Sequence, residues 1–253
     1  MFTRIIPVLT FKDQRMIKTV QFDEYYDVGD PVTTAKFYDS QDVDELILLD
    51  ITAFQEGRDP NFELINSFTA ECLMPLTIGG GITDLKHIEK MLLSGADKIC
   101  INSFACENPN FINEYSEIYG SQCIVVSIDV KKNKDNKYIV HTNGGQKNTN
   151  IDVLDWVKEV EDRGAGEILI NSIDKDGTMT GYDFELISSV TDKINDIPVI
   201  ALGGAGLLQD IVDVYYSANP SAIAMSSIFH FTDNKPVKAN AYAIENGIKA
   251  RAI

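Results

Sequence analysis

The sequence has few of the features that mark metal-binding, secreted, membrane or nucleic-acid-binding proteins. Its four cysteines and three histidines are scattered through 253 residues without a CxxC spacing, so neither a metal site nor a disulfide framework is indicated. No apolar run approaches the roughly 18 residues of a membrane-spanning helix, and the N-terminus lacks a signal-peptide core. With 22 basic against 38 acidic residues, the net charge of -16 argues against a nucleic-acid partner. We therefore expect a cytoplasmic protein with reduced thiols, no metal and no cofactor, which binds anions through backbone N–H groups and a few cations.

What the chain does contain is a regular alternation of short apolar runs and amphipathic stretches of helical length. The eight runs are RIIPVL, ELILLDI, PLTIGG, KICINS, CIVVSID, EILINSI, PVIALGG and AIAMSS. This rhythm predicts a parallel sheet, and eight strands is the number in a closed barrel. Two helices carry boundary signals, namely Asp30 before Pro31 as a cap and Gly164 as a terminator. We predict one α/β domain over residues 1–253, a (β/α)8 TIM barrel.

The sequence repeats itself at about half its length. The segment ELILLDITAFQEGRDPNFELI from Glu45 aligns without a gap on EILINSIDKDGTMTGYDFELI from Glu167. Nearly the same offset sets PLTIGGGI on PVIALGGAG and CINSF on MSSIF. Carried back to the N-terminus, the repeat sets IIPVLTFKD on IVVSIDVKK, so Thr10 corresponds to Asp129. We predict a barrel of two similar halves, one with a carboxylate where the other has a hydroxyl.

Small residues gather where the predicted strands end, which is the active-site face of such barrels. Backbone N–H groups in turns of this kind can approach an anion closely, and the repeat implies one phosphate cradle in each half. The alternative is that glycine and serine only form tight turns here. The candidate phosphate-binding residues are Gly81, Asn102, Ser103, Asp176, Gly177, Gly203, Gly204, Ser226 and Ser227.

Four charged residues stand at the opposite ends of the predicted strands. Arg4, Glu45, Lys98 and Glu167 share the strand parity of residues expected to point into the barrel. Two cations and two carboxylates would then compensate one another at the barrel floor. The pattern fits either a plug that closes the floor or a gate.

A set of short motifs spread over nearly the whole chain carries a family resemblance. They are RIIP, GGGI, INS, GSQCIVVSID, GAGEIL, DGT, GYD, GGAG and SIFHF. In these motifs the chain resembles the cyclase-subunit family of imidazole glycerol phosphate synthase. The resemblance implies a barrel with twofold internal symmetry, two phosphate sites and a glutaminase subunit docked at the N-terminal face. It also implies that the four charged residues form a gate for ammonia.

The family's reaction uses that ammonia to split a phosphoribulosyl formimino nucleotide into imidazole glycerol phosphate and an aminoimidazole carboxamide nucleotide, with two aspartates as general acid and base. Asp129 corresponds to the second aspartate, and Lys18 is retained, but Thr10 stands where the first aspartate is expected. A hydroxyl cannot shuttle protons near neutral pH, and loss of such a group typically costs about 10² to 10⁴ in rate. The family's rim threonine and serine are also changed, to Asn171 and Leu202. We expect the cyclase activity to be weakened or lost.

These departures resemble a branch of the family found with bacterial surface-sugar genes. The segments that match it are RIIPVL, KTVQF, VGDP, VDELILLDI, PNFELI and ECLMPL. There, barrel and glutaminase supply ammonia that converts an acetamido group on a sugar to an acetamidino group. Amide activation usually consumes ATP, and the chain has no GxxxxGK or SGGxDS loop, so a third, ATP-dependent sugar-activating enzyme is implied. Two alternatives stay open: a working histidine-pathway cyclase, and a non-catalytic phosphate-binding scaffold.

Two further expectations concern single segments. The stretch between Lys12 and Asp30 is long for a strand-to-helix connection, which predicts a mobile lid. His230 is expected to pack near a barrel end rather than to take part in catalysis.

Overall fold

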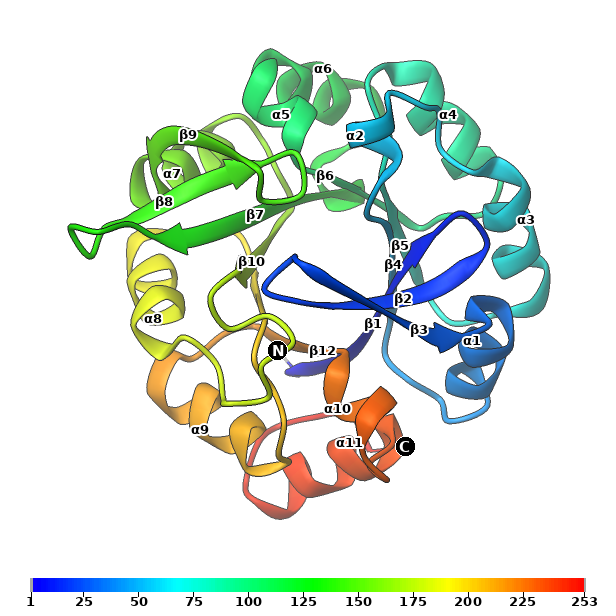
Figure 1. The fold of residues 1–253 in the computed structure, drawn as a ribbon, viewed down its shortest axis with the longest axis vertical. Helices are drawn as coiled ribbons and strands as arrows, with labels where there is room; N and C mark the ends of the chain where they lie inside the picture. Colours follow the sequence, from blue (N-terminus) through cyan, green and yellow to red (C-terminus); the bar gives the residue numbers. More distant parts are fainter. Residues whose placement is uncertain (1, 253) are drawn as a thin grey trace.

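The barrel is visible at once in the computed structural model, which describes residues 2–252 (Figure 1). Neighbouring barrel strands are parallel, and β12 pairs with β1 while β7 pairs with β10, so the sheet closes on itself. The barrel strands are β1 (Arg4–Lys12), β4 (Leu46–Asp50), β5 (Leu76–Gly79), β6 (Lys98–Ile101), β7 (Ile124–Lys132), β10 (Glu167–Ser172), β11 (Val199–Leu202) and β12 (Ala222–Met225). The predicted (β/α)8 fold and its eight strands are confirmed.

Helices surround the barrel (Figure 1). They are α1 (Pro31–Asp39), α2 (Ala53–Glu56), α3 (Phe62–Glu71), α4 (Leu85–Leu93), α5 (Ser103–Glu107), α6 (Asn110–Tyr119), α7 (Val153–Asp162), α8 (Phe184–Lys193), α9 (Gln209–Ala218), α10 (Ser227–Phe231) and α11 (Pro236–Glu245), with a 3₁₀ turn at Ser121–Cys123. Asp30 caps α1 by accepting a hydrogen bond from the Thr33 N–H at 2.7 Å. Gly164 follows α7 with φ of +93°, a conformation that few other residues adopt. Both boundary predictions are confirmed. Each helix among residues 2–252 is too short or too polar to span a lipid bilayer.

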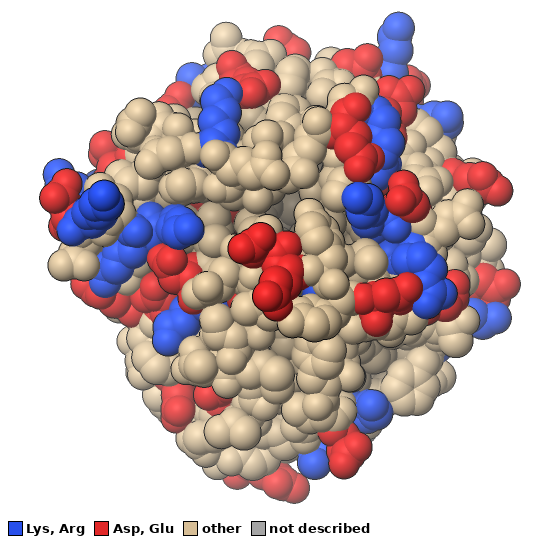
Figure 2. Space-filling view, in the orientation of Figure 1, with Lys and Arg blue, Asp and Glu red and all other residues tan. Residues whose placement is uncertain are grey.

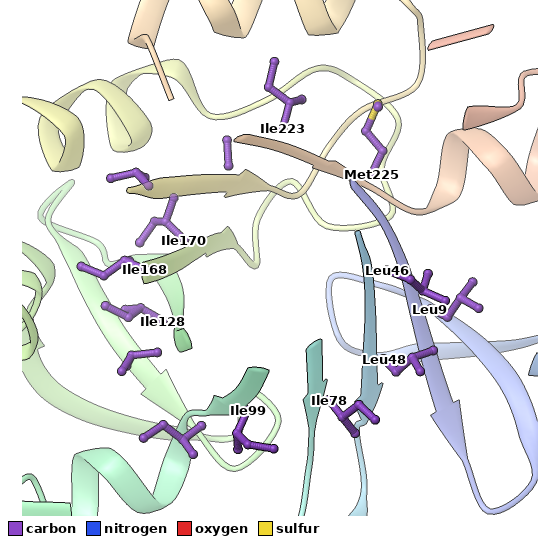
Figure 3. Close-up of a cluster of buried hydrophobic side chains, with 14 of the residues drawn as sticks. Leu9, Leu46, Leu48, Ile78, Ile99, Ile128, Ile168, Ile170, Ile223 and Met225 are labelled. Carbon is purple, nitrogen blue, oxygen red and sulfur yellow. The ribbon is translucent and has the colours of Figure 1, made fainter. Parts of the chain in front are cut away.

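Alternation along the strands creates two apolar layers. One set of side chains packs between strands and helices, and Figure 3 labels ten of these from the barrel strands, including Leu9, Leu48 and Ile128. The alternate set fills the barrel interior and is a separate cluster. Its members are Ile6, Val8, Ile47, Cys100, Val125, Leu169, Ile200, Leu202, Ala222 and Ala224. The barrel interior is therefore largely apolar, and Thr77 and Ser127 are buried polar residues of the same strands.

Two β-hairpins extend the barrel at its C-terminal end. The first consists of β2 (Arg15–Val20) and β3 (Glu24–Gly29), and it crosses the barrel mouth (Figure 1). The second consists of β8 (Tyr138–Thr142) and β9 (Lys147–Asp152), which continue from β7. The segment between Lys12 and Asp30 is thus an ordered hairpin rather than an irregular loop, because its residues pair with one another. Its mobility stays a prediction.

The strand register tests the internal repeat. Thr10 pairs with Leu49 across β1 and β4, and Asp129 pairs with Asn171 across β7 and β10. Leu49 and Asn171 are equivalent under the repeat, so Thr10 and Asp129 occupy equivalent positions in the two halves. The short helices α5 and α10 both have five residues and follow Asn102 and Ser226. The structure therefore makes Asn102 equivalent to Ser226. The sequence alignment of CINSF on MSSIF had set Asn102 on Ser227, one residue further along.

Candidate functional site

A cavity of about 160 Å³ opens at the mouth of the barrel. The ends of the barrel strands form its floor and the β2–β3 hairpin forms part of its wall. Figure 2 looks onto this face, where acidic side chains gather near the centre, over the hairpin. Thr10, Lys18, Asp129, Asn171 and Leu202 all line the cavity, so the residues singled out from separate strands meet in one place.

Asp129 lies at the floor of the cavity between two asparagines. Asn102 Nδ2 donates to one carboxylate oxygen at 2.7 Å, and Asn171 Nδ2 donates to the other at 3.2 Å. Burial raises the pKa of Asp129 to about 7, against the lowering effect of the two amide hydrogen bonds, and the nearby Asp176 raises it further. A carboxyl group with a pKa near neutrality can both accept and return a proton under physiological conditions.

Thr10 is engaged with the hairpin. Its hydroxyl donates a hydrogen bond to the carbonyl oxygen of Ile17 on β2. The side chain at this position therefore helps to hold the hairpin over the mouth, and it offers no titratable group to the cavity.

Lys18 is buried and already paired. Its Nζ donates to both carboxylate oxygens of Asp176 at 2.9 and 3.0 Å, and the Thr19 hydroxyl donates to the same carboxylate at 3.2 Å. The hairpin residue predicted to be catalytic is thus bound to a residue predicted to contact phosphate.

The predicted phosphate-binding residues divide into two groups. Gly81, Asn102, Ser103, Asp176 and Ser226 line the cavity. The other four, namely Gly177, Gly203, Gly204 and Ser227, are at the same rim but outside the cavity lining given by the described residues. Three buried polar atoms in the cavity lining have no hydrogen-bond partner within residues 2–252: Asn102 Oδ1, Asn171 Oδ1 and Ser226 Oγ.

The four charged residues at the other end of the barrel form a closed ring. Arg4 Nη1 lies 2.7 Å from Glu45 and Nη2 lies 2.7 Å from Glu167. Lys98 Nζ lies 2.9 Å from Glu45 and 2.7 Å from Glu167. Thr77 adds a hydrogen bond to Glu45 at 2.5 Å. Each cation therefore bridges both carboxylates, as the strand parity predicted.

The ring is electrostatically self-consistent. Burial acts against both charges, but the two carboxylates more than offset it for Arg4, whose pKa is raised. Likewise burial alone would raise the pKa of Glu167, yet Arg4 and Lys98 hold it below its ordinary value. The ring thus favours the charged forms of Arg4 and Glu167, and its ion pairs close it.

Sequence reasoning missed several residues of the cavity. Asp50 is buried, and Arg58 binds it with two hydrogen bonds of 2.7 and 2.9 Å. Phe22, Phe54 and Phe104 also line the cavity, from the hairpin, α2 and α5. Most of these contacts join segments that are distant in sequence, so the sequence did not indicate them. The exception is the pair of Asp50 and Arg58, whose positions at the end of a predicted strand and shortly after it could have indicated a place in the cavity.

Two further expectations concern His230 and a possible metal site. Burial, followed by Lys18 and Lys235, lowers the pKa of His230 to about 4, so its ring is neutral at pH 7. Within residues 2–252, the His, Cys, Asp and Glu side chains form no group of three or more placed to hold a metal ion.

Comparison with known proteins gives one family and close relatives. The family model described as histidine biosynthesis protein matches residues 4–235. A protein of Natranaerobius thermophilus named imidazole glycerol phosphate synthase subunit HisF is 45% identical over 248 residues, which cover 98% of each chain. A protein of the same name from Hydrogenobaculum sp. (strain Y04AAS1) is 46% identical over 248 residues, again with 98% of each chain covered.

Proposed function

Because the chain belongs to the histidine biosynthesis protein family, among the relatives named imidazole glycerol phosphate synthase subunit HisF, we propose that it is the ammonia-using subunit of a glutamine amidotransferase complex. A glutaminase subunit docks at the N-terminal end of the barrel and releases ammonia there. The ammonia crosses the barrel and reacts at the opposite mouth.

One observation carries this proposal, namely the largely apolar barrel interior between the charged ring and Asp129. The ring of Arg4, Glu45, Lys98 and Glu167 lies at one end of the lumen and the cavity at the other. Neutral ammonia can cross an apolar interior, whereas ammonium would have to shed its hydration at high cost. The ring then acts as the gate, opening when one of its ion pairs separates.

At the mouth, Asp129 is the residue suited to proton transfer. Among the described residues lining the cavity it is the one carboxyl group without a cationic partner, since Asp50 is bound by Arg58 and Asp176 by Lys18. When the ammonia nitrogen forms a bond to an electrophilic carbon, the nitrogen must lose a proton. The Asp129 carboxylate accepts that proton and can return it to the leaving group.

Two candidate reactions follow from this arrangement. The comparisons better support the first, cyclisation to imidazole glycerol phosphate in histidine biosynthesis, because that enzyme is named for both relatives. Thr10 supports the second, formation of an acetamidino group on a bacterial surface sugar, because a reaction needing two aspartates would lack one of them. In the second case a third, ATP-dependent enzyme activates the sugar amide, and the barrel delivers ammonia.

Complementation of a histidine-requiring strain that lacks its cyclase separates the two candidates. Robust growth with the unchanged chain supports cyclisation and excludes the second candidate. No growth, with soluble barrel present in the cells, excludes cyclisation. The Asp129→Asn variant is the matched control, because growth that survives this change does not depend on the cavity described here.

A further inference from the structure

The charged ring is supported differently in the two halves of the barrel floor. We propose that Asp44, held in place by Arg251, is a positioning residue for the ring and sets how readily the ion pair between Arg4 and Glu45 separates. This inference rests on the proposed function, because it concerns the same gate, and it identifies the side on which the gate opens.

In the second half, the sheet itself holds the ring residue. The ladder between β7 and β10 begins at the ring, where Glu167 pairs with Val125, and just before it the Gly166 N–H donates to the Ile124 carbonyl oxygen at 3.1 Å. The 3₁₀ turn at Ser121–Cys123 packs so closely on Gly166 that a Cβ there would lie 2.0 Å from the Ser121 carbonyl oxygen. Backbone hydrogen bonds and backbone packing therefore fix the position of Glu167.

In the first half, the corresponding ladder stops short of the ring. Strands β1 and β4 are in register from Val8 and Ile47 onward, so Glu45 lies two residues before the first registered pair. Continuing this register by three residues towards the floor sets Ile5 opposite Asp44. There the Ile5 N–H donates to Asp44 Oδ2 at 3.2 Å. A side chain thus provides the hydrogen bond beside the ring, where the second half uses the backbone.

The segment Lys249–Arg251, which follows α11, holds the Asp44 carboxylate. Arg251 Nε donates to Asp44 Oδ1 at 2.9 Å, and Arg251 Nη2 donates to the Asp42 carbonyl oxygen at 2.5 Å. The Lys249 carbonyl oxygen accepts a hydrogen bond from the Thr3 N–H at 2.8 Å. This segment is therefore bonded directly beside the ring residues of both β1 and β4.

The burial of these groups indicates positioning rather than global stability. The Asp44 side chain is 8% exposed and that of Arg251 is 52% exposed, and such a half-exposed ion pair contributes little to the stability of a fold. The bonds of Asp44 do restrict where β4 begins relative to β1. Because the 2.7 Å contact between Arg4 and Glu45 depends on that separation, the ring should loosen first on this side.

Carbon-13 NMR of the barrel without ammonia or glutaminase tests the positioning. In Asp44→Ala the side-chain carboxyl signal of Glu45 should shift, and that of Glu167 should not. The Ile5 amide should exchange with solvent about fivefold faster or more, as expected for loss of one net hydrogen bond. An unmoved Glu45 signal, or equal shifts for Glu45 and Glu167, would overturn the inference.

A double-mutant cycle tests whether Arg251 acts through Asp44. Arg251→Ala should shift the Glu45 signal in the same direction as Asp44→Ala, and combining the two changes should add nothing to Asp44→Ala alone. Additive shifts would show that Arg251 does not act through Asp44. Lys36→Ala, which removes the exposed ion pair with Glu71, is the matched control and should leave the signal unchanged.

The ratio of glutamine hydrolysed to ammonia incorporated tests the effect on the gate. It is measured with saturating glutaminase and with the acceptor of whichever reaction complementation supports. Asp44→Ala should raise this ratio about twofold, in line with the small energy of a half-exposed pair. The rate with ammonium salt in place of glutamine should not change, whereas a merely structural defect would lower both rates.

The Lys98→Ala variant separates failure of this inference from failure of the proposed gate. If Lys98→Ala alters the ratio and Asp44→Ala does not, the gate stands and the positioning role of Asp44 is overturned. If neither change alters the ratio, the ring is not a gate, and this inference fails with it.

Discussion

The hydroxyl of Thr10 donates a hydrogen bond to the carbonyl oxygen of Ile17, the residue that precedes Lys18. This bond ties the end of β1 to the hairpin that crosses the barrel mouth. Thr10, the residue equivalent to Asp129 in the first half of the barrel, therefore helps to hold the hairpin over the cavity.

Replacing Thr10 by aspartate should loosen the hairpin. A carboxylate cannot donate to the Ile17 carbonyl and would be repelled by it, so the backbone amides of residues 15–20 should exchange with solvent about fivefold faster or more, as expected for loss of one net hydrogen bond. Hydrogen exchange followed by mass spectrometry measures this. Thr10→Ser keeps the donor and should exchange as the unchanged protein does. Equal protection in the aspartate variant would show that the bond does not hold the hairpin.

Lys18→Met should destabilise the fold strongly. It leaves the Asp176 carboxylate buried without a cation, and removal of one partner from a buried pair typically costs about 3 to 5 kcal/mol. Urea denaturation of the variant gives the change in the free energy of unfolding. Adding Asp176→Asn to the same chain removes the unpaired charge and should recover much of the loss. A double variant no more stable than Lys18→Met would argue that packing of the lysine stem, rather than its charge, is responsible.

Asp129→Asn should raise the free energy of unfolding at pH values above about 4. Burial raises the pKa of Asp129 to about 7, well above that of an aspartate in the unfolded chain. Between about pH 4 and 7 the unfolded state releases this proton more readily than the folded state, so the native protein loses stability as pH rises through this range. The variant lacks the penalty, and its advantage should grow from pH 4 to 7 and then level off at about 2 to 4 kcal/mol.

Denaturation of both proteins between pH 4 and 8 measures that difference. The exposed Asp155 on α7 provides a control, because Asp155→Asn removes a carboxyl group that is not buried. A difference between Asp129→Asn and the unchanged protein that does not vary with pH would contradict the assignment.

Lys98→Ala should uncouple the two reactions of the proposed complex. Lys98 bridges Glu45 and Glu167, so its removal opens one side of the ring and leaves the two carboxylates with Arg4 alone. The ratio of glutamine hydrolysed to ammonia incorporated, measured with the glutaminase present, should rise by about twofold or more, or transfer should stop. Lys158→Ala, which removes the ion pairs of Lys158 with Glu161 and Asp162 on α7, far from the ring in sequence, is the control. An unchanged ratio would show that the ring is only a plug.

Much of the barrel follows from local sequence. Each of the eight strands is a short apolar run, and the caps at Asp30 and Gly164 depend on residues within one helical turn. The β2–β3 hairpin escaped prediction because RMIKTV mixes polar and apolar residues without a clear pattern and EYYDVG is mostly exposed. The order of the hairpin comes from pairing of its two strands and from contacts with distant loops. Local patterns do not contain that information.

The candidate site shows the same division. The internal repeat identified Thr10 and Asp129 as equivalent, and strand parity brought Arg4, Glu45, Lys98 and Glu167 together, because alternation and register fix which way side chains point. The position of Asn102 at the end of a predicted strand suggested that it contacts phosphate, but in the structure its amide nitrogen donates to Asp129.

The sequence by itself determined a two-halved barrel with a charged floor and a rim of small residues, since these depend on periodicity and spacing along the chain. Only the tertiary structure decided that Lys18 is bound by Asp176, that two asparagines hold Asp129, and that the hairpin covers one half of the rim. The physical reason is that burial and pairing join segments far apart in sequence, as with Lys18 and Asp176, which are 158 residues apart, and these contacts decide what each group at the mouth can bind.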